Sequence, residues 1–174
     1  MRSITFISAM LAASVAGAQE FGGECWARDY SAEHLAKHPE QTVEELRIAF
    51  KPWEDMAGVA DIRATMAENA YTRADGTAGK SYSNVLLCNI HEGGSGWPDW
   101  LEAGRMTCQG ECDGGFFQVV SLEPGALTIR TEGVAVSDGT GCGSTLVADV
   151  AKGDPNRTVL TTFRLESAPP GVCQ

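Results

Sequence analysis

The sequence is poor in histidine and in basic residues. It has 3 histidines, and its 13 lysines and arginines stand against 23 aspartates and glutamates, which gives a net charge of −10. Nucleic-acid binding needs a basic surface, so this balance argues against a nucleic-acid partner. With so few histidines a Ser-His-Asp triad has little to draw on, and the G-x-S-x-G pattern fails at Trp97. We therefore expect a protein that is not an enzyme.

Long apolar segments are also missing, except at the N-terminus. Arg2 gives a short basic start, residues 4–15 are mostly apolar, and residues 16–18 form an A-x-A cleavage site, which is the pattern of a secretory signal peptide. The apolar run is shorter than the roughly 20 residues that span a bilayer. We expect residues 1–18 to be cleaved and residues 19–174 to form a single periplasmic or secreted domain without a membrane span.

The six cysteines all follow this segment, so the exported chain is expected to form disulfides in an oxidising compartment. They are Cys25, Cys88, Cys108, Cys112, Cys142 and Cys173. An even number favours three bridges, for which fifteen connectivities are possible.

Spacing restricts one of these pairings. In an extended segment the Cα atoms of Cys108 and Cys112 would lie roughly 13 Å apart, beyond the roughly 7 Å that a disulfide allows. Each must therefore bond to another element, and Cys88, on the preceding apolar strand, is the natural partner for one of them. A bond from Cys142 to Cys173 or Cys25 is a further expectation.

Most of the chain reads as short β-type segments separated by Gly, Asp, Asn and Pro. The predicted strands are residues 42–50, 58–67, 82–90, 105–112, 116–122, 127–131 with a continuation at 134–137, 146–150 and 158–165. Residues 42–50 also fit a helix, but the alternation of Leu46, Ile48 and Phe50 favours a strand. About eight antiparallel strands close into a barrel or pack as a sandwich, and we favour the all-β barrel because closure removes exposed edges.

One short helix is expected over residues 32–37, with Ser31 at the N-cap and Pro39 beyond its end, after an irregular segment through Trp26. His34 and His38 lie four residues apart and would share a face of this helix, so they are candidate metal ligands. The alternative is a pair of surface or capping histidines. No cofactor is otherwise predicted.

Residues 74–81, Ala-Asp-Gly-Thr-Ala-Gly-Lys-Ser, come close to a phosphate-binding loop. Ala74 takes the place of the first glycine, and strands rather than a long helix surround the segment. We interpret it as a polar turn.

A loop rich in glycine and tryptophan is predicted over residues 91–104. Trp97, Asp99 and Trp100 surround a proline there and could form a rigid aromatic contact surface for an unknown small molecule or protein partner. The alternative is that both rings cap the barrel core.

Two segments carry a resemblance. Residues 30–41 (YSAEHLAKHPEQ) and 111–116 (ECDGGF) resemble segments of uncharacterised exported proteins of alphaproteobacteria. The resemblance implies a periplasmic location in a Gram-negative cell and implies no activity or catalytic residue.

The sequence thus predicts an exported, non-enzymatic binding domain. A first alternative is a proteinaceous inhibitor of a cationic hydrolase such as lysozyme, which the negative charge suits. A second is a metal-binding protein or metal-dependent enzyme that uses His34 and His38. An open barrel interior would favour a small ligand, whereas a filled interior would favour the loops and a protein partner.

Overall fold

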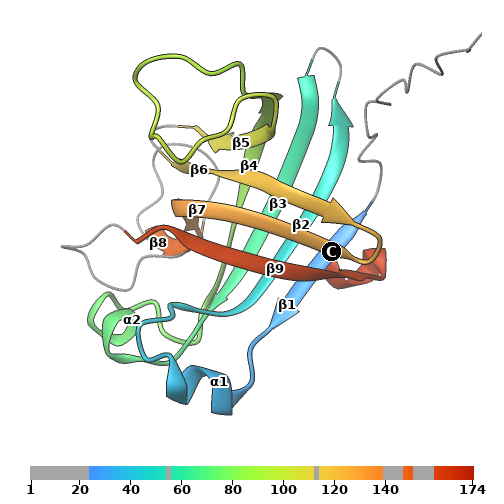
Figure 1. Ribbon diagram of the computed structural model, residues 1–174. Helices are drawn as coiled ribbons and strands as arrows, with labels where there is room; N and C mark the ends of the chain where they lie inside the picture. Colours follow the sequence, from blue (N-terminus) through green and yellow to red (C-terminus); the bar gives the residue numbers. More distant parts are fainter. Residues whose placement is uncertain (1–23, 54–55, 112–113, 139–146, 151–158) are drawn as a thin grey trace, which may run out of the picture.

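The computed structural model describes residues 24–53, 56–111, 114–138, 147–150 and 159–174, and these form mostly antiparallel strands (Figure 1). The strands are β1 (Cys25–Asp29), β2 (Val43–Trp53), β3 (Met56–Met66), β4 (Ser81–Ile90), β5 (Met106–Gly110), β6 (Gly115–Glu123), β7 (Ala126–Ser137), β8 (Val147–Val150) and β9 (Thr161–Ala168). The helices are α1 (Ala32–Lys37), α2 (Ala70–Ala74) and the 3-10 turn η1 (Pro170–Cys173).

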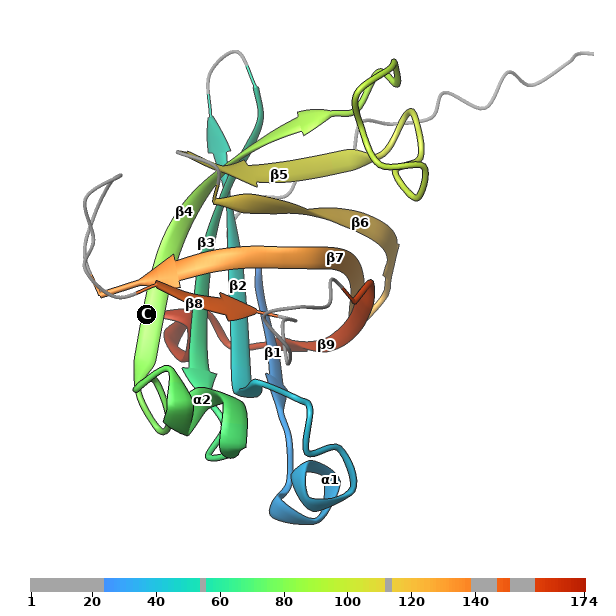
Figure 2. The same cartoon turned by 90° about the vertical axis from the view of Figure 1, so that its left-hand side faces the viewer.

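Eight of the strands close into a barrel (Figure 2). The sheet runs β6-β5-β4-β3-β2-β1-β9-β7, and β7 pairs again with β6, which joins its two edges. β8 pairs with the last residues of β7, outside this ring. The predicted all-β antiparallel barrel is confirmed, and closure gives each of its eight strands two hydrogen-bonded neighbours.

The strand assignment was wrong at the first strand. Residues 25–29, expected to be irregular, form β1, because β2 and β9 pair with this segment from both sides. This five-residue segment has one buried ring, Trp26, and little alternation of apolar and polar residues. Its extended conformation therefore comes from pairing with these neighbouring strands. The strand predicted over residues 146–150 is confirmed over its described residues as β8, which pairs with β7 beside the ring.

Both short helices have N-caps that the sequence supplies. Helix α1 is confirmed, with the Ser31 side chain accepting a hydrogen bond from His34 N at 3.2 Å. Helix α2 was not predicted; Asn69 and Thr72 form a capping box at its start. The turn after α2 is closed by Lys80 Nζ, which donates to Gly76 O at 2.7 Å.

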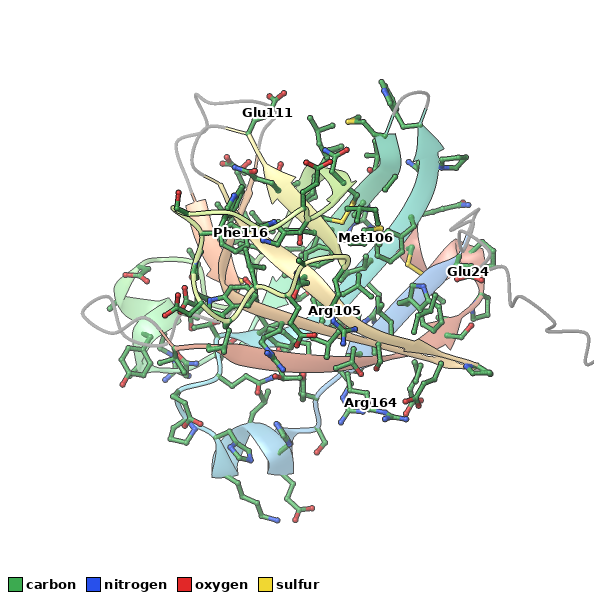
Figure 3. All side chains as sticks on the ribbon, turned by 45° about the horizontal axis from the view of Figure 1, so that its top comes forward. Glu24, Arg105, Met106, Glu111, Phe116 and Arg164 are labelled. Atoms are coloured by element: carbon green, nitrogen blue, oxygen red, sulfur yellow. A yellow bond between two sulfur atoms is a disulfide. The ribbon has the colours of Figure 1, made fainter. Side chains whose placement is uncertain are left out.

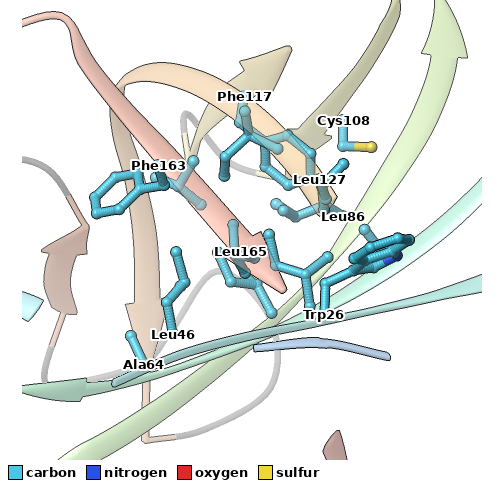
Figure 4. Packing of buried hydrophobic residues seen from close by; sticks show 14 of the residues in the cluster. Trp26, Leu46, Ala64, Leu86, Cys108, Phe117, Leu127, Phe163 and Leu165 are labelled. Carbon is cyan, nitrogen blue, oxygen red and sulfur yellow. The ribbon is translucent and has the colours of Figure 1, made fainter. Parts of the chain in front are cut away.

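Side chains fill the barrel interior (Figure 4). Phe50 and Phe117 meet edge to face with ring centroids 6.5 Å apart. The largest fully buried side chains include Leu46, Ile48, Ile62, Met66, Leu86, Leu127, Ile129 and Leu165. Together with Phe50 and Phe117 they come from six strands of the ring, so the interior is a packed hydrophobic core.

One disulfide belongs to this core. Cys88 on β4 lies directly opposite Cys108 on β5, with Cα atoms 4.0 Å apart, and both residues are 0% exposed. The prediction that Cys88 bonds to one member of the Cys108/Cys112 pair is confirmed. Cys112 itself lies outside the described residues.

The second disulfide is on the outside of the barrel. Cys25 at the start of β1 bonds to Cys173 in η1, with Cα atoms 5.8 Å apart. The expectation that Cys142 bonds to one of these two residues is therefore wrong. Cys142 and residues 1–18, the predicted signal peptide, lie outside the described residues. In the described part of the chain, no helix has the length and hydrophobicity needed to cross a bilayer.

Candidate binding site at the tryptophan loop

The tryptophan loop, residues 91–105, connects β4 to β5 and returns to its starting point. His91 N donates to Arg105 O at 2.8 Å, and Gly104 N donates to His91 O at 2.7 Å. Gly104 has a φ of +79°, in the left-handed region that favours glycine, which lets the chain turn back toward His91. In Figures 1 and 2 the loop lies at the end of the barrel opposite α1 and α2.

The aromatic rings of the loop pack on the outer wall of the barrel. Phe117 belongs to the core, so its neighbour Phe116 on β6 points outward. Trp100 stacks on Phe116 at 5.5 Å between ring centroids, and Trp97 meets the same ring edge to face at 5.5 Å. Trp97 is 40% exposed. The rings therefore cover Phe116 on the outer wall, which excludes the alternative that they cap the core.

A buried amide ties the loop to the wall. Gln118 on β6 is 1% exposed; its Oε1 accepts from Glu102 N at 3.0 Å and its Nε2 donates to Glu102 O at 2.9 Å. Arg105 adds a second tie, because its Nε donates to Glu102 Oε2 at 2.5 Å and its Nη1 donates to Val120 O. Sequence reasoning missed Gln118, since its role depends on a loop that folds over an outward position.

A groove of about 680 Å³ lies between the loop and the outer face of β4 and β5. The register pairs Leu87 with Gln109 and Asn89 with Thr107, so these outward side chains form its floor. Trp97 forms part of the loop side of the groove. A smaller hollow of about 290 Å³ lies beside Pro98 and Phe116 and includes Glu132.

The charged side chains that line the groove and the smaller hollow are acidic. Glu92 and Glu111 line the groove, Glu132 lines the smaller hollow, and Asp99 is exposed in the loop. None of these four carboxylates forms an ion pair within the described residues, and neither lining includes a lysine or arginine. Figure 3 shows Glu111 at the rim, on the same side of the barrel as Phe116. The predicted residues Trp97, Asp99 and Trp100 thus belong to an aromatic surface with acidic surroundings.

The predicted metal ligands lie elsewhere. His34 and His38 do share a face of α1, with ring centroids 4.5 Å apart. His34 Nε2 lies 3.4 Å from Gln41 Oε1, and His38 Nδ1 lies 3.5 Å from Glu40 Oε1. Within the described residues, no group of three or more His, Cys, Asp or Glu side chains could hold a metal ion. The metal site at His34 and His38 stays a hypothesis.

Comparison of the chain with protein families, curated proteins and solved structures found no match. The fold and the site define a class of protein: a closed eight-stranded antiparallel barrel with a filled interior and an aromatic loop fixed to its outer wall.

Proposed function

We propose that the protein is an exported, non-enzymatic binding domain whose contact surface is the tryptophan loop and the adjoining groove. The observation that carries this proposal is the exposed Trp97 beside an open groove, on a barrel whose interior is filled by side chains. A filled core favours contact through the outer surface, and tryptophan is enriched at the energetic centres of interfaces.

The way in which the loop is held supports a binding role. The loop backbone is fixed in the absence of a partner by the hydrogen bonds between His91, Gly104 and Arg105 at its base. The Gln118 amide and the Arg105 guanidinium hold it further. A preorganised surface loses less conformational entropy on association than a mobile one. The one imidazole at this site supports a non-enzymatic role, because His91 is only 8% exposed and its ring lies 5.3 Å from that of Trp97.

Export is supported by two features. Residues 1–18 have the pattern of a signal peptide, and two disulfides within the described residues suit an oxidising compartment such as the periplasm.

A second candidate function is inhibition of a cationic hydrolase such as lysozyme. The carboxylates of Glu92 and Glu111 favour it, since they line the groove and lack ion pairs within the described residues. A lytic assay with lysozyme and excess purified protein tests it. Loss of lysis that returns in the Trp97→Ala variant supports inhibition, and undiminished lysis rejects it.

The binding function itself is tested by selection of displayed linear peptides on the purified protein. We expect enriched peptides whose binding is lost in the Trp97→Ala variant. The matched control is Trp53→Ala, because Trp53 at the end of β2 is 60% exposed and does not line the groove. Circular dichroism verifies that both variants fold. Failure to enrich any peptide, or binding that ignores Trp97, would reject the loop as the contact surface.

A further inference from the structure

Apolar, amide and acidic side chains line the groove. Leu87 and Ile90 on β4 are 38% and 54% exposed, and both line it. Asn89 and Gln109 place amides on the same floor, where they can exchange hydrogen bonds with a peptide backbone. This is the chemistry that an extended peptide segment meets when it lies along a strand, with alternate side chains turned toward the floor.

The two groove carboxylates lie near its opposite ends. Gly110 pairs with Leu86, so Glu111 follows the end of β5 near Leu86, whereas Glu92 lies beyond Ile90 at the other end of the β4 segment. Between these ends β4 extends for about six residues, or roughly 20 Å. The groove therefore suits a short extended segment with one acidic side chain of the protein near each of its ends.

Charge defines what such a segment must carry. Some exposed carboxylates elsewhere have a basic partner within the chain, as Glu33 has in Lys37 and Glu68 has in Arg73. Glu92 and Glu111 have none within the described residues, and no lysine or arginine lines the groove. Basic side chains from outside would find one carboxylate near each end of the groove and the exposed ring of Trp97, which can interact with a cation.

A membrane surface is a second class of partner that could bind exposed tryptophan and isoleucine side chains. Anionic headgroups would be repelled by Glu92, Glu111 and the exposed Asp99, so these charges favour a protein.

Resting on the binding function proposed above, we propose that the groove binds an extended protein segment with alternating apolar and basic residues. The apolar side chains lie on Leu87 and Ile90, and the basic side chains lie at Trp97 and at the carboxylate near each end of the groove. The partner is therefore a cationic protein that exposes such a segment.

Three labelled peptides test this chemistry by fluorescence anisotropy. They share alternating valines and differ only in the intervening residues, which are all Arg, all Gln or all Glu. We expect the Arg peptide to bind about tenfold more tightly than the Gln peptide, because several weak charge contacts add to one tenfold step. The Glu peptide binds most weakly, and added salt reduces the preference for Arg.

Matched variants locate the effect. The double variant Glu92→Gln/Glu111→Gln removes two charges and should weaken the Arg peptide about tenfold while leaving the Gln peptide unchanged. The control Glu24→Gln/Glu123→Gln removes the same charge from exposed carboxylates outside the groove, and we expect less than a twofold change. Figure 3 shows Glu24 well apart from Glu111.

The outcomes separate this inference from the binding function. If the Arg and Gln peptides bind equally well and both depend on Trp97, the proposal that the partner is basic is rejected. The binding function at the tryptophan loop then still stands. The same holds if no peptide of the three binds although displayed peptides are enriched. Trp97-dependent binding to vesicles of anionic phospholipid would reject the proposed protein partner in favour of a membrane surface. If displayed peptides also fail to enrich, both proposals fall.

Discussion

Gln118 holds the backbone of Glu102 from both sides: its amide oxygen accepts from Glu102 N at 3.0 Å and its amide nitrogen donates to Glu102 O at 2.9 Å. The amide nitrogen also lies 3.2 Å from Thr107 Oγ1, to which it donates. One side chain thereby supplies both the donor and the acceptor that a neighbouring strand would have given to Glu102. The tryptophan loop is thus fixed to β6 through a side chain.

We predict that Gln118→Leu lowers the free energy of unfolding by about 2 kcal/mol, because the N–H and C=O groups of Glu102 each lose a hydrogen bond to the Gln118 side chain, at about 1 kcal/mol per bond. Urea denaturation measures this, and hydrogen exchange of the Glu102 amide should accelerate. The control is Gln109→Leu, since Gln109 is exposed on β5 and a change within about 0.5 kcal/mol is expected. Unchanged exchange at Glu102 in the Gln118 variant would contradict the tie.

Two glycines with the same backbone conformation should respond differently to alanine. Gly115 and Gly76 have φ values of +68° and +71°. A Cβ on Gly115 would lie 2.1 Å from Gly133 O, whereas none of the described atoms lies within 4 Å of one on Gly76. We expect Gly76→Ala to cost about 1 kcal/mol for the left-handed conformation, and Gly115→Ala to cost about 3 kcal/mol or more because β6 and β7 must separate. Thermal denaturation compares them, and equal losses would refute the close approach.

The two disulfides among the described residues should be reduced in a fixed order. Cys88 and Cys108 are completely buried, whereas Cys173 lies in the partly exposed turn η1. A thiol reductant under native conditions should therefore open the Cys25–Cys173 bond first, and the Cys88–Cys108 bond only after the barrel unfolds. Alkylation followed by peptide mass mapping identifies each thiol. Early labelling of Cys88 in folded protein would contradict the interior position of that bond.

Tyr82 should make the fold sensitive to alkali. Burial raises the pKa of the Tyr82 phenol above its usual value of 10.0, and the Asp138 carboxylate raises this pKa further. Because the unfolded chain releases this proton first, stability is full below pH 10 and falls as the pH rises through the pKa of the folded state. Tyr82→Phe should reduce this alkaline loss in denaturation curves. Tyr71→Phe on the surface of α2 is the control, and a loss identical to that of the unmodified protein would contradict the assignment.

The same variant tests a buried hydroxyl. Tyr82 is 3% exposed, and its oxygen has no hydrogen-bond partner among the described residues. At neutral pH, removing it should leave stability unchanged or raise it by about 1 kcal/mol.

The fold could be predicted to the extent that local alternation records it. Leu46, Ile48 and Phe50 alternate strictly and form an inward face of β2, as expected. Trp26 could not be placed in the same way, because the pairing of β1 comes from partners far along the chain. The tryptophans of the site were recognisable by composition, whereas Gln118 and the groove carboxylates acquire their roles only from the cross-strand register and the path of the loop.

The bond between Cys25 and Cys173 links β1 to a turn that follows every strand of the barrel, across a sequence separation of 148. β1 also needs β9 as its second hydrogen-bonded neighbour. A chain that emerges from its N-terminus, from a ribosome or through a translocation pore, therefore cannot complete the ring until its last strand is free. Once the bond has formed, an unfoldase or translocase that pulls on either end of the chain reaches a loop closed by a disulfide. It must then thread two segments of the chain through its pore at once, or stop at the bond.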